Sequence, residues 1–412
     1  MNLSPVLSAL AAALAEEGPA VEFGPAVQPA PPTGTAPAPS DDAAWRLWRP
    51  SEAAASLPEG TAVVVRTSGS TGAPKATALT VDALAASSAA TATALRGEGQ
   101  WLLALPLEYV AGVQVLVRSL FAGTRPWAMD LSDGFTPGAF ADAAEQLTDP
   151  VRFTSLVPTQ LRRLLDDGSA RVMAALARFD AVLVGGAPMP PGLLERARAA
   201  GVTAVATYGS AETCGGCVYD GEPLPGVEVR LVEGRVWLGG DVVAAGYVGD
   251  PERTVEHFCA DEDGRRWYVS SDVGEWGEDG RLHILGRVDD VVITGGVKAS
   301  AARVAAEIGS LPGVREAFVA GVDDAEWGQA LAVAVALAPG ATAQAVEADA
   351  VVRLGRLTPK VWAVLESLPH LPNGKPDRLA LMALLESLSA DTASGSGRGA
   401  GGKSHNGGPQ AP

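Results

Sequence analysis

The chain has 412 residues, of which 47% are hydrophobic, and a formal net charge of −17. This length accommodates two or three domains with a large core, and so acidic a balance argues against a nucleic-acid-binding protein. Three cysteines do not make a disulfide framework, so we expect a cytoplasmic protein. No apolar run approaches membrane-spanning length, so we expect no membrane insertion. The first apolar segment, residues 3–14, lacks the basic start of a signal peptide and is interpreted as a packing helix.

Alternating helix and strand patterns cover the first half of the chain. A loop rich in Pro and Ala at residues 25–40 precedes a helical pattern from Asp41 and an apolar, β-branched strand at residues 62–65. The next expected elements are a helix at 81–95, a strand at 101–105, a helix at 113–121, a strand-and-helix unit at 153–165, and strands at 181–184 and 203–207. This alternation predicts an α/β layered sheet, in which ligands bind at the carboxyl ends of the strands.

The pattern changes after Pro223 to short strands and turns, which predict a small β-rich subdomain at the end of an N-terminal domain covering residues 1–288. Residues 289–388 predict a small α+β domain. The Gly- and Ser-rich residues 389–412 predict a disordered tail.

A loop that suits phosphate binding follows the strand at residues 62–65 directly. Residues 66–75 read Arg-Thr-Ser-Gly-Ser-Thr-Gly-Ala-Pro-Lys. The glycines allow backbone N–H groups to approach an anion, while the hydroxyls and the ammonium add donors. The loop differs from a Walker A motif, because Pro74 precedes Lys75 and Ala76 follows it. A polar hairpin at the surface is the alternative interpretation.

Four further motifs follow this loop along the chain. They are Tyr208-Gly209-Ser210-Ala211-Glu212-Thr213, Tyr268-Val269-Ser270-Ser271-Asp272, Gly286-Arg287-Val288-Asp289-Asp290 and Pro372-Asn373-Gly374-Lys375. In this order and spacing the chain resembles the adenylate-forming superfamily of acyl-CoA synthetases, amino-acid adenylation domains and luciferases. Within it, residues 112–120, 155–161 and 212–219 are most similar to the o-succinylbenzoate–CoA ligases of menaquinone biosynthesis, in their compact actinobacterial form.

The resemblance implies a large α/β nucleotide domain and a small, mobile C-terminal lid. It also implies two half-reactions, in which a carboxylate attacks ATP to give acyl-AMP and pyrophosphate, and the CoA thiol then displaces AMP. ATP and CoA would be co-substrates, with Mg²⁺ as cofactor. The implied nucleotide contacts are Thr67, Ser68, Ser70, Thr71 and Lys75 for the phosphates, Gly185, Gly186, Ala187 and Tyr208 for adenine, and Asp272 and Arg287 for the ribose. Gly69, Gly72 and Gly209 are further implied nucleotide-binding residues.

The resemblance also assigns three roles in the reaction. Glu212 resembles the Mg²⁺ ligand, a hard oxygen donor that suits this ion, although it could instead cap a helix. Lys375 resembles the lysine that stabilises developing charge during adenylation, and Asp289 the hinge of the lid. Asp272 alone could equally be a turn residue.

Arg118 is the predicted specificity residue. It interrupts the apolar run at residues 113–121, where an unpaired charge would be costly to bury. A planar guanidinium binds a carboxylate through two hydrogen bonds, and 2-succinylbenzoate keeps one carboxylate that is not activated. A salt bridge to a core acid, or a side chain that reaches solvent, is the alternative. Tyr109 and Gly112 complete the predicted substrate site.

Several alternatives stay open from the sequence. Cys214 and Cys217 form a Cys-x-x-Cys pattern, but without a second pair or a nearby histidine we interpret them as small packing residues. The enzyme could act on another aryl or acyl carboxylic acid, load amino acids as an adenylation domain, or bind adenylate without catalysis. The expected partners are small molecules, and a homodimer is an open option.

Overall fold

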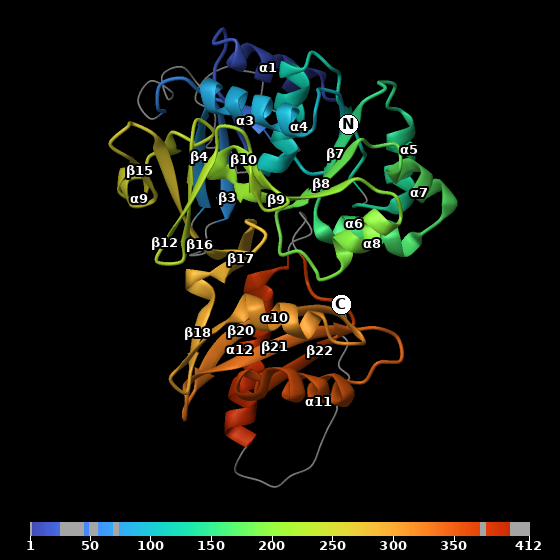
Figure 1. Ribbon diagram of the computed structural model, residues 1–412, viewed down its shortest axis with the longest axis vertical. Helices are drawn as coiled ribbons and strands as arrows, with labels where there is room; N and C mark the ends of the chain where they lie inside the picture. Colours follow the sequence, from blue (N-terminus) through green and yellow to red (C-terminus); the bar gives the residue numbers. More distant parts are fainter. Residues whose placement is uncertain are drawn as a thin grey trace, which may run out of the picture. The chain divides into compact units, whose positions relative to one another are not determined.

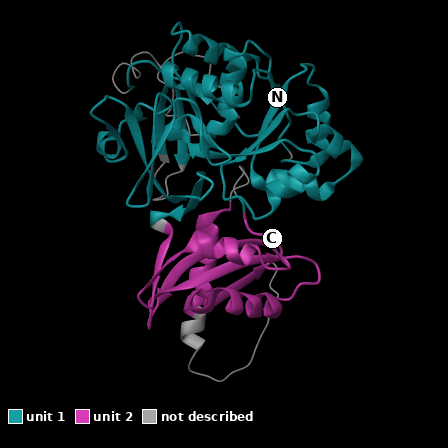
Figure 2. Ribbon diagram, viewed as in Figure 1, with its two compact units in different colours: residues 1–289, 370–375 teal, residues 290–369, 376–412 magenta. Residues whose placement is uncertain are grey.

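The computed structural model describes residues 2–24, 45–48, 57–68, 74–132, 134–370 and 376–395. Contacts divide the chain into two compact units (Figure 2). Unit 1 contains residues 1–289 and 370–375, and unit 2 contains residues 290–369 and 376–412.

A seven-stranded sheet forms one half of unit 1. Its strand order is β11-β10-β9-β8-β7-β5-β6, in which β6, β5, β7, β8 and β9 run parallel. The strands are β5 (Gln100–Leu103), β6 (Trp127–Ala128), β7 (Arg152–Leu156), β8 (Ala181–Gly185), β9 (Ala204–Ser210), β10 (Gly215–Tyr219) and β11 (Glu222–Pro223). Alternating helices and parallel strands confirm the predicted α/β class.

Side chains of this sheet pack in two directions. Leu102 packs in a cluster with helices α5 (Pro137–Glu145), α6 (Pro158–Asp167), α7 (Ala170–Leu176) and α8 (Leu193–Ala199) (Figure 1). Its neighbours Trp101 and Leu103 belong to a second cluster on the other face, because successive strand residues point to opposite faces. The sheet is therefore covered on both sides.

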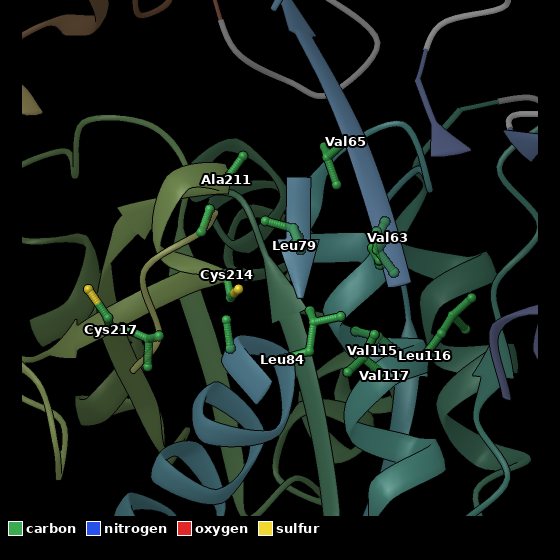
Figure 3. Packing of buried hydrophobic residues seen from close by; sticks show 14 of the residues in the cluster. Val63, Val65, Leu79, Leu84, Val115, Leu116, Val117, Ala211, Cys214 and Cys217 are labelled. Carbon is green, nitrogen blue, oxygen red and sulfur yellow. The ribbon is translucent and has the colours of Figure 1, made fainter. Parts of the chain in front are cut away.

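The second cluster joins this sheet to a five-stranded sheet of order β14-β4-β3-β1-β2. Its helices are α1 (Ser4–Leu14), α3 (Val81–Ala94) and α4 (Val110–Phe121). Figure 3 shows Val63, Leu79 and Val115 of three different elements in this cluster, together with Cys214 and Cys217. Both thiols are free and buried, and burial raises the pKa of each. The packing interpretation of these cysteines is confirmed.

Two elements of the five-stranded sheet correct the sequence prediction. The strands are β1 (Val21–Phe23), β2 (Trp45–Leu47), β3 (Thr61–Ser68), β4 (Pro74–Thr80) and β14 (Gly246–Tyr247). The helical pattern expected from Asp41 is wrong at residues 45–47, which pair with β1 while Arg46 Nε donates to buried Glu22 at 2.7 Å. The sequence also missed β4, which forms a hairpin with β3. In both places strand pairing overrides local propensity.

The β-rich part of unit 1 is confirmed as a sheet of short strands, with order β12-β13-β16-β15 and β17 beside β16. Its strands are β12 (Glu228–Val232), β13 (Arg235–Gly239), β15 (Phe258–Ala260), β16 (Arg266–Trp276) and β17 (Leu282–Arg287). Helix α9 (Pro251–His257) follows β14.

Unit 2 is the predicted α+β body, a five-stranded sheet with three helices. Its elements are β18 (Val291–Thr294), β19 (Val297–Ser300), α10 (Ala301–Gly309), β20 (Val314–Asp324), β21 (Gly328–Leu337), α11 (Ala343–Leu354), β22 (Val361–Leu365) and α12 (Arg378–Gly395). The tail predicted from residue 389 begins too early, because α12 continues to Gly395 and Ser389 Oγ donates to the Asp323 carbonyl at 3.4 Å. Among the described helices, none is both long and apolar enough to span a bilayer.

Candidate nucleotide and carboxylate site

Lys75, Glu212 and Tyr247 form a polar cluster in unit 1. The Lys75 ammonium of β4 makes an ion pair with Glu212, which follows β9 and is only 2% exposed. Tyr247 Oη of β14 donates to Glu212 Oε1 at 2.8 Å and accepts from Lys75 Nζ at 3.3 Å. Lys75, the last residue of the loop at residues 66–75, therefore pairs with Glu212 of the Tyr208–Thr213 motif.

Electrostatics keep Glu212 charged in this cluster. Burial alone would raise the pKa of its carboxyl, but the charge and hydrogen bond of Lys75, with the Tyr247 hydroxyl, lower it overall. Burial and the adjacent Glu212 raise the pKa of Tyr247, so the phenol stays protonated and can donate. The side chains that act on the Glu212 carboxylate are thus Lys75 and Tyr247, with a further contribution from Ser210.

A second polar group joins Tyr208, Asp272 and Arg287. Tyr208 Oη donates to Asp272 Oδ2 at 2.7 Å, and Arg287 Nη1 lies 3.8 Å from Asp272 Oδ1. Asp272 and Arg287 are register partners in strands β16 and β17, so the turn interpretation of Asp272 is wrong. Burial, and then the charge of Asp272, raise the pKa of Tyr208. A carboxylate and a guanidinium side by side can accept from and donate to vicinal hydroxyls.

The predicted adenine residues lie where β8 and β9 end. Gly185 closes β8 and is followed by Gly186 and Ala187, while Tyr208 and Gly209 fall near the end of β9. Gly209 has a φ of 156°, and a Cβ there would come within 2.2 Å of the Gly215 carbonyl oxygen. These carboxyl ends match the expected position for a ligand in an α/β sheet.

Several predicted residues fall outside the described residues. These are Gly69, Ser70, Thr71 and Gly72 of the loop, Lys375, and the side chains of Ser68 and Asp289. The backbone of Asp289 lies in the 3₁₀ turn Val288–Asp290. Thr67 is described at the end of β3, and its buried hydroxyl has no hydrogen-bond partner within the described ranges.

Arg118 of α4 is 6% exposed and lines a cavity of about 280 Å³ between α3, α4 and the sheet. Its guanidinium carbon lies 5.2 Å from the centroid of the Trp101 ring. No acid pairs with it in the described part of the chain, and its buried Nε lacks a hydrogen bond there. Ser88 Oγ, on the same cavity, is likewise buried without a partner. Within the described residues Arg118 makes no salt bridge to a core acid and is largely buried, so neither alternative interpretation is supported there.

Gln114 connects the Arg118 cavity to the Glu212 segment. It lies one turn before Arg118 on α4, and its Nε2 donates to the Cys214 carbonyl. Cys214 has a φ of 50°, in the left-handed region that few non-glycine residues occupy. Gln114 therefore holds an uncommon turn two residues after Glu212.

Tyr109 and Gly112 stand at the start of α4. Tyr109 is its half-buried N-cap residue, and burial followed by the charge of Glu108 raises its pKa. A Cβ at Gly112 would come within 2.3 Å of the Pro106 carbonyl oxygen, so close backbone packing requires glycine there. Gly112 thus has a structural reason that the substrate interpretation did not consider.

Sequence reasoning missed Tyr247, Trp101 and Gln114. Tyr247 belongs to none of the five motifs and reaches Glu212 only through the pairing of β14 with β4. Gln114 and Trp101 were assigned to a helix and a strand without a role. The spacing of Gln114 and Arg118, four residues apart on one helix face, was the available signal.

Comparison with known proteins defines the class of this fold and site. Residues 6–275 match the AMP-binding enzyme family, and residues 304–375 match the AMP-binding enzyme C-terminal domain. The chain therefore belongs to the AMP-binding enzyme family.

Individual members of the family show which of its enzymes the chain is similar to. The chain is 42% identical over 333 residues to a protein of Mycobacterium tuberculosis named probable 2-succinylbenzoate–CoA ligase, covering 79% of this chain and 85% of the relative. It is 33% identical over 272 residues to the 2-succinylbenzoate–CoA ligase of Escherichia coli, covering 64% and 55%. Among solved structures, the o-succinylbenzoate CoA synthetase of Bacillus subtilis in complex with its acyl-adenylate intermediate is similar with a TM-score of 0.67 and 25% identity, covering 82% and 70%.

Proposed function

We propose that this chain joins 2-succinylbenzoate to CoA in an ATP-dependent reaction of menaquinone biosynthesis. The acid first forms an acyl-adenylate with release of pyrophosphate, and the CoA thiol then displaces AMP. The observation that carries the choice of acid is Arg118, a buried cation without an acidic partner in the described part of the chain. Similarity to ligases of this name supports the same choice.

Arg118 is the proposed partner of the carboxylate that is not adenylated. A guanidinium and a carboxylate can form two parallel, charge-assisted hydrogen bonds. Arg118 lies four residues beyond Gln114, about 6 Å along the helix axis, and Gln114 contacts Cys214 beside the Glu212 segment. A diacid with its carboxylates separated by a ring and a short chain suits such a distance. The Ser88 hydroxyl is available as a further donor.

The polar cluster of Lys75 and Glu212 is the proposed phosphate and metal region. The residues fit Mg²⁺, because this ion binds through one or two carboxylates together with substrate phosphates and Glu212 already accepts a cation. Within the described ranges no cluster of three or more His, Cys, Asp or Glu side chains suits a metal, and Mg²⁺ commonly completes its shell with water and substrate phosphates. When bound, Mg²⁺ would neutralise phosphate charge. Lys75 and the Thr67 hydroxyl are the proposed donors to the phosphate oxygens.

The remaining nucleotide contacts follow from the second polar group. Asp272, with Arg287, is the proposed partner of the ribose hydroxyls, and Tyr208 the proposed neighbour of adenine. Transfer at phosphorus requires mainly positioning and charge neutralisation from the protein. Lys375 is proposed to supply the last positive charge in adenylation, and Asp289 to be the hinge of a lid at residues 289–388.

The three free cysteines fit a cytoplasmic location.

The test is ATP–pyrophosphate exchange with a panel of carboxylic acids. We expect exchange with 2-succinylbenzoate, and a kcat/KM at least about tenfold lower for 4-oxo-4-phenylbutanoate, which lacks the second carboxylate. Benzoate and amino acids serve as the other members of the panel. Preferred exchange with an amino acid, or equal exchange with the diacid and the monoacid, would contradict the proposal.

A further inference from the structure

Tyr247 lies at the centre of the Lys75–Glu212 cluster, although no motif contains it. Its hydroxyl donates to Glu212 Oε1 at 2.8 Å. The Lys75 ammonium lies 3.3 Å from the same hydroxyl and 5.2 Å from the centroid of its ring. Lys75 and Tyr247 both contact Glu212 at Oε1, and the Ser210 side chain also lowers the pKa of the Glu212 carboxyl through a hydrogen bond. The lysine and the tyrosine therefore share one carboxylate oxygen, and neither of them bonds Oε2.

The surroundings of Tyr247 fix the direction of its hydroxyl. Its backbone N–H donates to Thr254 Oγ1 of α9 at 2.9 Å. Its ring lies edge-on to Phe258, with centroids 5.3 Å apart, and edge-on to His257 at 6.0 Å. The residue is 5% exposed. Packing on two sides and a backbone hydrogen bond hold such a side chain in one orientation.

The two bonds to Glu212 differ in what happens when a nucleotide binds. In the proposed function, the Lys75 ammonium pairs with the phosphates of the nucleotide. It then no longer neutralises the Glu212 carboxylate. A buried carboxylate without a partner is costly and free to rotate. Tyr247 carries no charge that phosphate would attract, and its ring is held by packing. Its hydroxyl, which also interacts with Tyr268, can therefore keep its hydrogen bond to Glu212 together with the Ser210 side chain.

We propose that Tyr247 is a positioning residue that holds Glu212 Oε1 while Lys75 moves to the nucleotide, so that the carboxylate keeps one orientation and would remain available to bind Mg²⁺. This inference rests on the proposed function of the cluster. It assigns Tyr247 to the binding of the metal–nucleotide complex rather than to contact with the acid.

The experiment measures binding of α,β-methylene-ATP, which cannot be adenylated, to Tyr247→Phe by calorimetry. We expect the dissociation constant at limiting Mg²⁺ to rise about tenfold, the factor for one hydrogen bond to a charged group. The difference from the parent protein should close at saturating Mg²⁺ and should be absent in EDTA. In pyrophosphate exchange, the Mg²⁺ concentration for half-maximal rate should rise while the KM for 2-succinylbenzoate stays unchanged.

The matched control is Tyr219→Phe. It removes another buried hydroxyl from the same core, one that bonds Thr91 Oγ1 at 3.1 Å and does not contact Glu212. This variant should keep the parental Mg²⁺ dependence. Equal Mg²⁺ dependence of the two Phe variants, or weaker nucleotide binding by Tyr247→Phe in EDTA as well, would overturn the proposal. A chain that binds α,β-methylene-ATP but does not exchange pyrophosphate with 2-succinylbenzoate would instead contradict the proposed substrate alone.

Discussion

The two polar regions of unit 1 differ in how their charges are compensated. In the nucleotide region, Lys75 pairs with Glu212 and Arg287 lies near Asp272, and a tyrosine hydroxyl supports each carboxylate. In the cavity region, the Arg118 guanidinium contacts the Trp101 ring and pairs with no acid among the described residues. Among the described residues, the charges of the first region pair within the protein, whereas Arg118 in the second makes no ion pair, although Glu98 lines the same cavity.

This difference indicates where binding free energy is available. An internal ion pair must be broken before its charges can serve a ligand, which reduces the net gain on binding. An unpaired buried cation lowers the stability of the free protein. Binding of a carboxylate offsets this free energy cost, because it gives the cation a partner. We therefore expect the nucleotide region to contribute more to stability and the Arg118 cavity more to choice of substrate.

The largest expected effect concerns Lys375, the proposed source of positive charge in adenylation. Lys375→Ala should lower the rate of adenylate formation about a thousandfold, as for removal of one donor to a developing oxyanion. Thioester formation from pre-formed acyl-AMP should be largely spared, because no charge develops on the α-phosphate in the same way. Rapid-quench measurement of each half-reaction checks this expectation. Equal losses in both half-reactions would contradict it.

The next effect tests internal compensation directly. Lys75→Met removes the cation from a carboxylate that is 2% exposed, so the free energy of unfolding without nucleotide should fall by about 3 kcal/mol. Lys360→Met is the control, since its pair with Asp324 at 3.1 Å is partly exposed and should contribute under about 1 kcal/mol. Urea unfolding followed by tryptophan fluorescence measures both. A loss no larger than that of the control would show that Glu212 needs no partner.

The third effect separates the two regions by substrate. Arg118→Ala should raise the KM for 2-succinylbenzoate by about one to two decades, since a charge-assisted bond contributes about 1.5–3 kcal/mol. The KM for ATP should stay near the parental value, and so should the KM for 4-oxo-4-phenylbutanoate. Initial rates with each substrate varied in turn provide the measurement. A rise confined to ATP would move Arg118 to the nucleotide region.

The sequence predicted the charged residues of these two regions but not all of their partners. The resemblance of short motifs to a known family identified Glu212 and Asp272, and Arg118 was identified because a charged residue inside an apolar run is visible in the sequence. The role of Tyr247 could not be predicted from the sequence, since its contact with Glu212 depends on strand pairing between segments far apart in the chain. The same limitation explains the missed β4, whose alanines have little strand propensity and are ordered by pairing with β3. That no described acid pairs with Arg118 could not be predicted from the sequence either, because it depends on the neighbours that the fold brings to this side chain.

The smallest effect gives the comparison its sharpest test, because its sign is opposite to that of Lys75→Met. Arg118→Met replaces an unpaired buried cation with an apolar side chain that can still contact the Trp101 ring. Loss of the cation–π contact costs about 0.5–2 kcal/mol, while removal of a buried group with an unmade hydrogen bond returns about 1–3 kcal/mol. We expect the free energy of unfolding to rise by about 1 kcal/mol, seen as a higher urea midpoint with an unchanged slope. Adding 2-succinylbenzoate should stabilise the parent protein and not this variant. A fall in stability like that of Lys75→Met would mean that the Arg118 charge is already compensated in the free protein.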